Sequence, residues 1–172
     1  APPPGAFLQA TAEGEAALLQ AVREAVGKAS RITDLFAGSG TFSLPLAEQA
    51  EVHAVEGEAA MMAALDKGWR MAEGLRRVTC ETRDLFRRPL EPDEFKGVEA
   101  VVIDPPRAGA EAQVATLAHS KVPVIAMVSC NPVTFARDAR VLIAGGYRLD
   151  WVQVVDQFRW SAHVELVARF TR

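Results

Sequence analysis

The 172-residue sequence has few cysteines and histidines, the residues that form the disulfides of small secreted domains and the ligands of structural metal sites. It contains only two cysteines, Cys80 and Cys130, which lie far apart, and three scattered histidines. This supply satisfies neither a disulfide framework nor a zinc-binding pattern, and two cysteines cannot ligate an iron–sulfur cluster. We therefore expect no metal in this chain, and any cysteine with a special role is expected to act as a free thiol.

Long hydrophobic runs are also missing. The longest, "VPVIAMVS" at residues 122–129, is far below the length that spans a bilayer, and the first residues show no signal-peptide pattern. A cytoplasmic protein without membrane contact is the resulting expectation. Positive charge is not in excess either, because the formal net charge is −3, which argues weakly against strong nucleic-acid binding through clustered Lys and Arg.

What the sequence does contain is enough for one compact domain. Hydrophobic residues make up 49% of the chain, so it can bury a continuous core. No internal repeat or low-complexity segment divides it. Residues 1–7, "APPPGAF", have the composition of a linker, so we interpret residues 1–172 as a single domain cut from a longer protein, and we expect a monomer.

Apolar, strand-like runs alternate with helical patterns along the chain, which predicts an α/β domain with a mostly parallel sheet. Only a short segment separates the last two predicted strands, so these two are expected to pair antiparallel as a C-terminal hairpin. Five parallel strands followed by a hairpin form the sheet of a class I, Rossmann-like methyltransferase. The predicted strands are 31–36, 52–57, 78–84, 98–106, 122–130, 147–158 and 163–172, and the predicted helices are 12–27, one from 42, 58–73, 111–120 and 132–142.

The stretch "DLFAGSGTF", residues 34–42, predicts a cofactor-binding turn. Gly38 and Gly40 stand where the backbone must turn tightly out of a strand and let a ligand approach. A dinucleotide fingerprint needs a third glycine where this chain has Ser43, and the Lys-Ser/Thr pair of a triphosphate-binding loop is absent. Glu56, at the end of the second strand, is placed to bind both ribose hydroxyls. S-adenosylmethionine has this ribose and no phosphate, so it is the predicted cofactor; the alternative is that the glycines only make a tight turn.

A second carboxylate, Asp84, ends the third predicted strand in the tripeptide "RDL". In that position it could meet the amino group of the cofactor's adenine. A helix-capping role for Asp84 is equally compatible with the sequence, so both interpretations stay open.

Three motifs carry a resemblance to a known family. They are "VVIDPPRAG" at 101–109, "SCNPVTFARD" at 129–138 and "HVE" at 163–165, and they occur in the family's order. Many amino-group methyltransferases have an aromatic residue after the Pro-Pro pair, but this chain has Arg107 there. The sequence thus resembles the RNA uracil-C5 methyltransferases, which make 5-methyluridine in ribosomal or transfer RNA, from Pro4 to the last strand.

The resemblance implies a role for each matching residue. Cys130 matches the nucleophile and Glu165 matches the base that abstracts a proton. Asp104 is implied to position either the cofactor or the base, and the motif does not decide which. The positions that match residues around the methyl donor are Gln9, Phe36, Thr41, Glu56, Asp84 and Asp104.

The chain departs from the family pattern at several positions. The family loop usually has Cys where this chain has Ala37, and often has Asn at Thr41, which affects cofactor contacts and leaves the catalytic groups unchanged. Before the base, the family reads Phe-Pro-His-Thr-Gly-His, whereas residues 158–163 read "FRWSAH" and keep only Phe158 and His163 as the matching Phe and final His. Details of RNA recognition should differ there. Full-length relatives also carry N-terminal RNA-binding parts, some with an iron–sulfur cluster, that this chain lacks.

The chemistry explains why a cysteine stands at residue 130. Uracil C5 is a poor nucleophile until a thiolate adds to C6, after which C5 attacks the methyl group, a base removes the C5 proton and the thiol is eliminated. Cys130 precedes a predicted helix that begins at Asn131-Pro132, and a helix N-terminus is expected to lower the pKa of this thiol. The alternative, a buried structural cysteine, suits Cys80 better.

Glu165 shares one strand face with His163 and Val167, which otherwise resembles a core face. A carboxylate there is costly unless it is used or paired, so a catalytic base is predicted, with a satisfied edge-strand acid as the alternative. His163 is interpreted as an orienting or core histidine. Arg107, which could pair with a carboxylate or with phosphate, is left without a role.

An RNA substrate with its uridine in a loop or single strand is expected, because the base must be unstacked. Residues 70–90 hold an excess of arginines that could touch an RNA backbone, or simply form a solvated face. Two other functions stay open: a silent cofactor-binding or RNA-binding module, and a methyltransferase acting on a small molecule or a protein. Neither of these needs the Cys130 and Glu165 pair. The arginines are Arg70, Arg76, Arg77, Arg83, Arg87 and Arg88.

Overall fold

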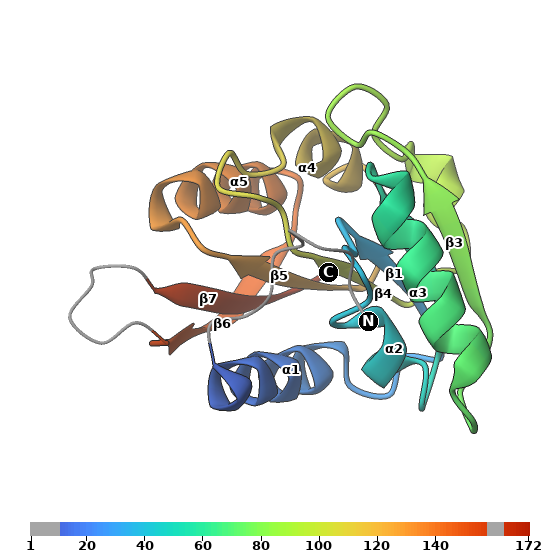
Figure 1. The fold of residues 1–172 in the computed structure, drawn as a ribbon. Helices are drawn as coiled ribbons and strands as arrows, with labels where there is room; N and C mark the ends of the chain where they lie inside the picture. The colour runs from blue at the N-terminus through green and yellow to red at the C-terminus, as the bar shows by residue number, and fades with distance from the viewer. Residues whose placement is uncertain (1–10, 158–163) are drawn as a thin grey trace.

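The computed structural model describes residues 11–157 and 164–172, which form one seven-stranded sheet flanked by helices (Figure 1). The strand order across the sheet is β3-β2-β1-β4-β5-β7-β6. The strands are β1 (Arg31–Leu35), β2 (Glu51–Glu56), β3 (Val78–Thr82), β4 (Ala100–Ile103), β5 (Val124–Ser129), β6 (Arg148–Val155) and β7 (Glu165–Thr171). The helices are α1 (Ala12–Val26), α2 (Ser43–Leu46), α3 (Ala59–Met71), η1 (Pro92–Phe95, a 3₁₀ turn), α4 (Glu111–Leu117) and α5 (Pro132–Ala144).

The first five strands are parallel, and β7 is antiparallel to both β5 and β6. This confirms the predicted fold class and the C-terminal hairpin. The pairing adds one feature that the sequence did not indicate: the last strand, rather than β6, lies against β5. As a result the start of β7 is brought to the edge of the sheet where the parallel strands end.

Helices cover both faces of the sheet, with α1 and α2 on one side and α4 and α5 on the other (Figure 1). Alternate residues of the buried strand β4 serve the two layers, because successive strand side chains point to opposite faces. Val102 belongs to the core under α1, whereas Val101 and Ile103 belong to the core under α4 and α5. The sheet is therefore buried on both faces, as a parallel sheet must be.

Local signals in the sequence place the helix ends. The Thr11 hydroxyl accepts the Gly14 amide at 2.9 Å to begin α1, and Gly27, with φ at 60°, ends it. Asn131 accepts the Val133 amide at 3.0 Å, and Pro132 occupies the first position of α5. The helix predicted to begin near residue 42 starts at Ser43 and is a single turn, Ser43–Leu46.

No helix within residues 11–157 and 164–172 is long and apolar enough to cross a membrane.

Candidate active site

The predicted catalytic residues meet at the edge where the parallel strands end. Cys130 directly follows β5, and Glu165 begins β7. Ser129 is paired with Leu166 in the antiparallel register, and continuing this register by one residue places Cys130 opposite Glu165. Glu165 also acts electrostatically on the Cys130 thiol, which agrees with this proximity. Two residues that are distant in the sequence are thereby brought to one place, with Glu165 only 3% exposed.

The glycine turn after β1 is tied to the predicted ribose-binding residue. Glu56 accepts the Gly38 amide at 3.1 Å through Oε2 and the Glu58 amide at 3.0 Å through Oε1. A carboxylate offers about four acceptor positions, so two amides leave capacity for ligand hydroxyls. Phe36 has a φ of 61°, in the left-handed region that non-glycine residues rarely adopt, and such strain concentrates at functional sites. A Cβ on Gly38 would meet nothing within 4 Å, so space lies beside the turn.

Asp34 is a site residue that the sequence reasoning passed over. It is fully buried at the end of β1 and accepts a 2.5 Å hydrogen bond from the Ser43 hydroxyl through Oδ2. Its Oδ1 has no hydrogen-bond partner within the described residues. Burial raises the pKa of Asp34 to about 7, Ser43 opposes this shift, and Glu56 adds to it. The sequence did contain a signal for Asp34. A carboxylate near the end of an apolar strand, just before a glycine turn, is costly to bury unless it has a functional or structural partner.

Asp104 follows β4 and joins the same acidic group. Burial raises its pKa to about 8, and the nearby carboxylates of Glu165 and Asp34 raise it further. The Asp104 side chain keeps partial contact with solvent, and both neighbouring carboxylates act in the same direction as its burial. Glu56, Asp34, Asp104 and Glu165 thus form an acidic edge, and a cationic ligand bound there would favour the ionised forms of these groups.

The environment of Cys130 differs from the prediction. Burial raises the pKa of its thiol, and the carboxylates of Glu165 and Asp104 raise it further, while Arg107 partly lowers it. The expected lowering by the start of α5 is wrong for the chain as the structure describes it. The physical reason is that Asn131 already caps the first turn of α5, and burial together with two carboxylates outweighs the remaining effect of the helix.

Asp84 closes a turn and does not cap a helix, because no helix begins directly after it in the described structure. Its Oδ1 accepts the Phe86 amide at 3.0 Å and the Arg87 amide at 3.3 Å, and so closes the turn after β3. The Asp84 side chain is about half exposed, at 48%, so its remaining acceptor positions face solvent. Phe86 also contacts Phe36, with ring centroids 5.4 Å apart, which joins this turn to the glycine turn. Closing this turn therefore does not remove Asp84 from the predicted cofactor site.

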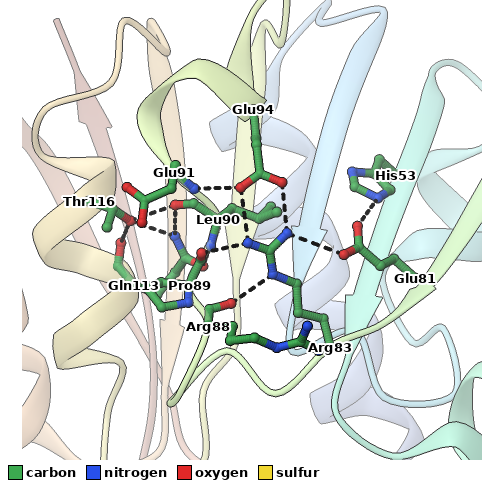
Figure 2. Close-up of polar contacts among 10 residues, drawn as sticks. All are labelled: His53, Glu81, Arg83, Arg88, Pro89, Leu90, Glu91, Glu94, Gln113 and Thr116. Carbon is green, nitrogen blue, oxygen red and sulfur yellow. Dashed lines mark hydrogen bonds and ion pairs between the residues drawn. The ribbon is translucent and has the colours of Figure 1, made fainter.

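One of the arginines in residues 70–90, Arg83, is held by contacts within the protein and is not available to bind RNA. Figure 2 shows Arg83 donating to Glu94 at 2.7 and 3.0 Å, to Glu81 at 3.3 Å, and to the carbonyls of Arg88 and Pro89. Arg70 and Arg87 also have acidic partners, Asp66 and Asp84. These contacts favour the solvated, ion-paired interpretation for Arg70 and Arg87, whereas the Arg83 side chain is only 16% exposed and is held among its partners.

One hollow, of about 550 Å³, lies between the turn after β3 and the first turn of α4, where Phe86, Gly109 and Arg137 line it. Another, of about 130 Å³, lies at the opposite edge of the sheet. None of the predicted site residues lines either of these hollows. Gln9, Phe158 and His163 lie outside the described residues. The half-buried Thr41 lies in the glycine turn, and its hydroxyl makes no hydrogen bond within the described residues.

Comparison with known proteins assigns the family. The sequence profile of the tRNA (uracil-5-)-methyltransferases matches residues 3–171, nearly the whole chain. The chain belongs to this family. The resemblance seen in the three motifs is thereby confirmed, and the residues that the family motifs single out, Cys130 and Glu165, are those that the β5–β7 register places opposite each other.

Curated relatives of this member of the uracil-5-methyltransferase family come from several bacteria. An uncharacterised RNA methyltransferase of Brucella suis is 57% identical over 99% of the chain, which spans 41% of that relative. The 23S rRNA (uracil(1939)-C(5))-methyltransferase of Chromohalobacter salexigens is 40% identical over 98% of the chain and 35% of its own length. The chain thus spans about two fifths of the length of the curated relatives it matches.

Solved structures agree with the family assignment. The Pyrococcus abyssi tRNA (uracil-54, C5)-methyltransferase, in complex with S-adenosyl-L-homocysteine, is similar with a TM-score of 0.84 and 30% identity. That match covers 98% of this chain and 41% of the archaeal one. An S-adenosylmethionine-dependent methyltransferase from Mesorhizobium loti has a TM-score of 0.72 at 15% identity, which shows the shared fold alone.

Proposed function

We propose that this domain transfers a methyl group from S-adenosylmethionine to C5 of a uridine in ribosomal or transfer RNA. The observation that supports this most strongly is the placement of Cys130 opposite Glu165 across β5 and β7, at the edge that also carries the glycine turn. Family membership and the names of relatives that act on uracil in 23S rRNA and in tRNA support the same reaction. A silent binding module would have no use for the thiol and carboxylate pair.

The residues at the edge suit the methyl donor. Glu56 keeps acceptor capacity for the two ribose hydroxyls, and the open space beside Gly38 allows close approach of the ligand. Asp84 serves the adenine amino group from the turn after β3, and Phe36 and Thr41 border the turn after β1. The unpartnered Oδ1 of Asp34 is a buried acceptor without a donor, and the acidic edge favours a ligand that carries positive charge. When bound, S-adenosylmethionine supplies an electrophilic methyl group.

Cys130 acts first in the proposed reaction. Its Sγ gives its proton to solvent, with which the half-exposed side chain keeps contact, and adds to C6 of the uracil ring. The electron pair of the C5–C6 double bond moves toward the carbonyl at C4, so C5 becomes nucleophilic and takes the methyl group. Because burial raises the pKa of Cys130, the thiolate is scarce at neutral pH and the addition step should quicken as pH rises.

Glu165 acts second. It removes the proton that C5 still carries after methylation, and the returning electron pair restores the C5–C6 double bond as Sγ leaves C6. The net change replaces the C5 hydrogen with a methyl group and releases one proton. Asp104, whose pKa of about 8 keeps it largely protonated at neutral pH, supplies a hydrogen-bond donor beside this base without adding a second full negative charge.

Covalent trapping tests the proposal. The protein encoded by the complete gene, which contains this domain, is incubated with radiolabelled methyl donor and transcripts of 23S rRNA or tRNA that contain 5-fluorouridine. Fluorine at C5 blocks the step assigned to Glu165, so a methylated RNA–protein adduct should survive denaturing electrophoresis. The transcript that forms the adduct identifies the substrate class.

Two variants assign the roles. Cys130→Ala should form no adduct, whereas Glu165→Gln should trap even ordinary uridine RNA, because addition and methylation precede the missing proton removal. The role assignments are wrong if Cys130→Ala still methylates C5 or if Glu165→Gln turns over at the normal rate. Methylation of protein or small molecules with no RNA adduct would instead support a different methyltransferase.

A further inference from the structure

The loop after β4 is fastened to α5 by four side chains from the segment that follows Cys130. Asn131 Nδ2 donates to the Arg107 carbonyl at 3.0 Å, and the Thr134 hydroxyl lies 3.2 Å from both the Arg107 and the Asn131 carbonyls and can donate to either. One turn further along, Arg137 donates to the Ala108 carbonyl at 3.1 Å. We call Asn131, Thr134, Arg137 and Asp138 the loop clamp, because together they hold residues 107–110.

Asp138 is the centre of the loop clamp. It is 1% exposed, accepts the Ala110 amide at 2.8 Å through Oδ2, and accepts Arg137 at 2.8 Å through Oδ1. A buried carboxylate with both oxygens occupied by charge-assisted or amide hydrogen bonds is costly to disturb, since removing it leaves the donors unsatisfied. Asp138 thus joins the loop backbone to the helix that follows the nucleophile.

The loop approaches α5 too closely for a side chain to stand between them. Gly109 has a φ of 77°, and a Cβ there would lie 2.5 Å from the Arg137 guanidinium, 2.7 Å from Asp138 Oδ2 and 3.0 Å from the Thr134 Cβ. Only glycine fits this approach without a shift. The contact is therefore an independent sign, besides the hydrogen bonds, that the loop has one position on the helix.

The loop clamp matters because of what the loop carries. Arg107 is the one cation among the described groups that act on Cys130; the others are the carboxylates of Glu165 on β7 and Asp104 after β4. Its backbone carbonyl is the atom that Asn131 and Thr134 contact, and Asn131 directly follows Cys130, so these contacts keep the start of the Arg107 side chain near Cys130. A guanidinium near a thiol favours the thiolate, whereas the two carboxylates oppose it.

We propose that Thr134, Arg137 and Asp138 are positioning residues that, with Asn131, keep Arg107 beside Cys130 and so support its thiolate. Arg107, which the sequence left without a role, is the group through which the loop clamp acts. The inference rests on the proposed function for the meaning of the thiolate, but it concerns a property of the thiol that is measurable without RNA.

The test measures alkylation of Cys130 by iodoacetamide against pH in the protein encoded by the complete gene, with peptide mass spectrometry to resolve each cysteine. Cys80, on β3, serves as the internal reference in every sample. Arg107→Ala, Asp138→Asn and Thr134→Val should each move the Cys130 profile to higher pH, and at pH 7 the rate should fall roughly three- to tenfold, as a shift of half to one pKa unit requires. Thr134→Ser, which keeps the hydroxyl, should stay close to the parent.

A matched control separates positioning from general stability. Asp150→Asn removes another mostly buried, ion-paired carboxylate, on β6, where it accepts from Arg148 at 2.7 Å and from the Thr171 hydroxyl at 3.0 Å. It should lower the melting temperature without moving the Cys130 profile. If Asp138→Asn and Thr134→Val lower the melting temperature but leave the profile in place, the loop clamp is only structural and the proposal is overturned.

A double-mutant comparison identifies the route. If the loop clamp acts through Arg107, then Asp138→Asn should add no further shift once Arg107 is already Ala. An undiminished second shift would overturn this part of the proposal. If no RNA–protein adduct forms but the alkylation profile of Cys130 still shifts in the loop-clamp variants, the catalytic role of Cys130 is refuted while the loop clamp stands. The two proposals can therefore fail independently.

Discussion

Replacement of Asp34 by Asn should raise the stability of the domain at neutral and alkaline pH and lower it in acid. Asp34 is fully buried, its Oδ1 has no partner within the described residues, and burial raises its pKa to about 7 from an ordinary 3.8. Below pH 3.8 the folded and unfolded chains both hold the proton. As pH rises toward 7 the unfolded chain loses its proton first, so the free energy of unfolding falls and the loss is complete above the folded pKa.

The magnitude follows from the size of the shift. About three pKa units correspond to about 4 kcal/mol as an upper limit on the penalty that Asp34 imposes above pH 7. The Asn amide avoids this penalty but brings donors without partners, at a cost of roughly 1–3 kcal/mol. The net gain above pH 7 is therefore about 1–3 kcal/mol, or several degrees in melting temperature for a domain of this size. At pH 4 only the cost remains, so the sign should reverse.

Thermal unfolding of parent and Asp34→Asn protein between pH 4 and pH 9 tests this reasoning. Asp150→Asn serves as the reference with the opposite sign. Hydrogen bonds from Arg148 and Thr171 lower the pKa of Asp150, so this carboxylate stabilises the fold above pH 3.8. The Asp150→Asn protein should therefore be less stable than the parent at neutral pH. An Asp34→Asn protein that is less stable than the parent at every pH would refute the argument. Weaker binding of S-adenosylmethionine by the same variant would show why the destabilising acid is retained.

Three shorter predictions follow from the same edge of the sheet. Glu56→Ala should weaken S-adenosylmethionine binding in calorimetry by roughly tenfold or more, about 1.5–3 kcal/mol, and unchanged affinity would remove Glu56 from the site. Cys130 alkylation should show a pKa above that of an ordinary cysteine, because of burial and two carboxylates; a value near neutrality would contradict this. Gly40→Ala should cost about 1–3 kcal/mol in urea unfolding, since its Cβ would lie 3.0 Å from Leu65, whereas Gly38→Ala, with open space, should cost only about 1 kcal/mol of backbone strain.

Much of the fold and part of the site follow from local signals. Apolar runs mark the buried strands, Thr11 and Gly27 mark the ends of the first helix, and the two glycines mark the turn after β1, because each signal acts on its own neighbours in the chain. The start of α2 was predicted near residue 42, but the sequence pattern set no end for it, because one apolar segment does not tell where tertiary packing ends a helix. The helix-capping alternative for Asp84 was wrong, because the residue closes a turn instead, and its exposed oxygens stay compatible with the predicted cofactor role.

The sequence by itself determined the family, the order of helices and strands, and which residue types could supply a nucleophile, a base and a ribose acceptor, since these depend on motifs and short-range periodicity. Only the tertiary structure decided that β7 lies between β5 and β6, which places Glu165 opposite Cys130. It also decided the sign of the shift in the pKa of Cys130, because desolvation and charge act through space. Groups that come from β4, β5 and β7 set that value together, and no local pattern in the chain records how close they lie.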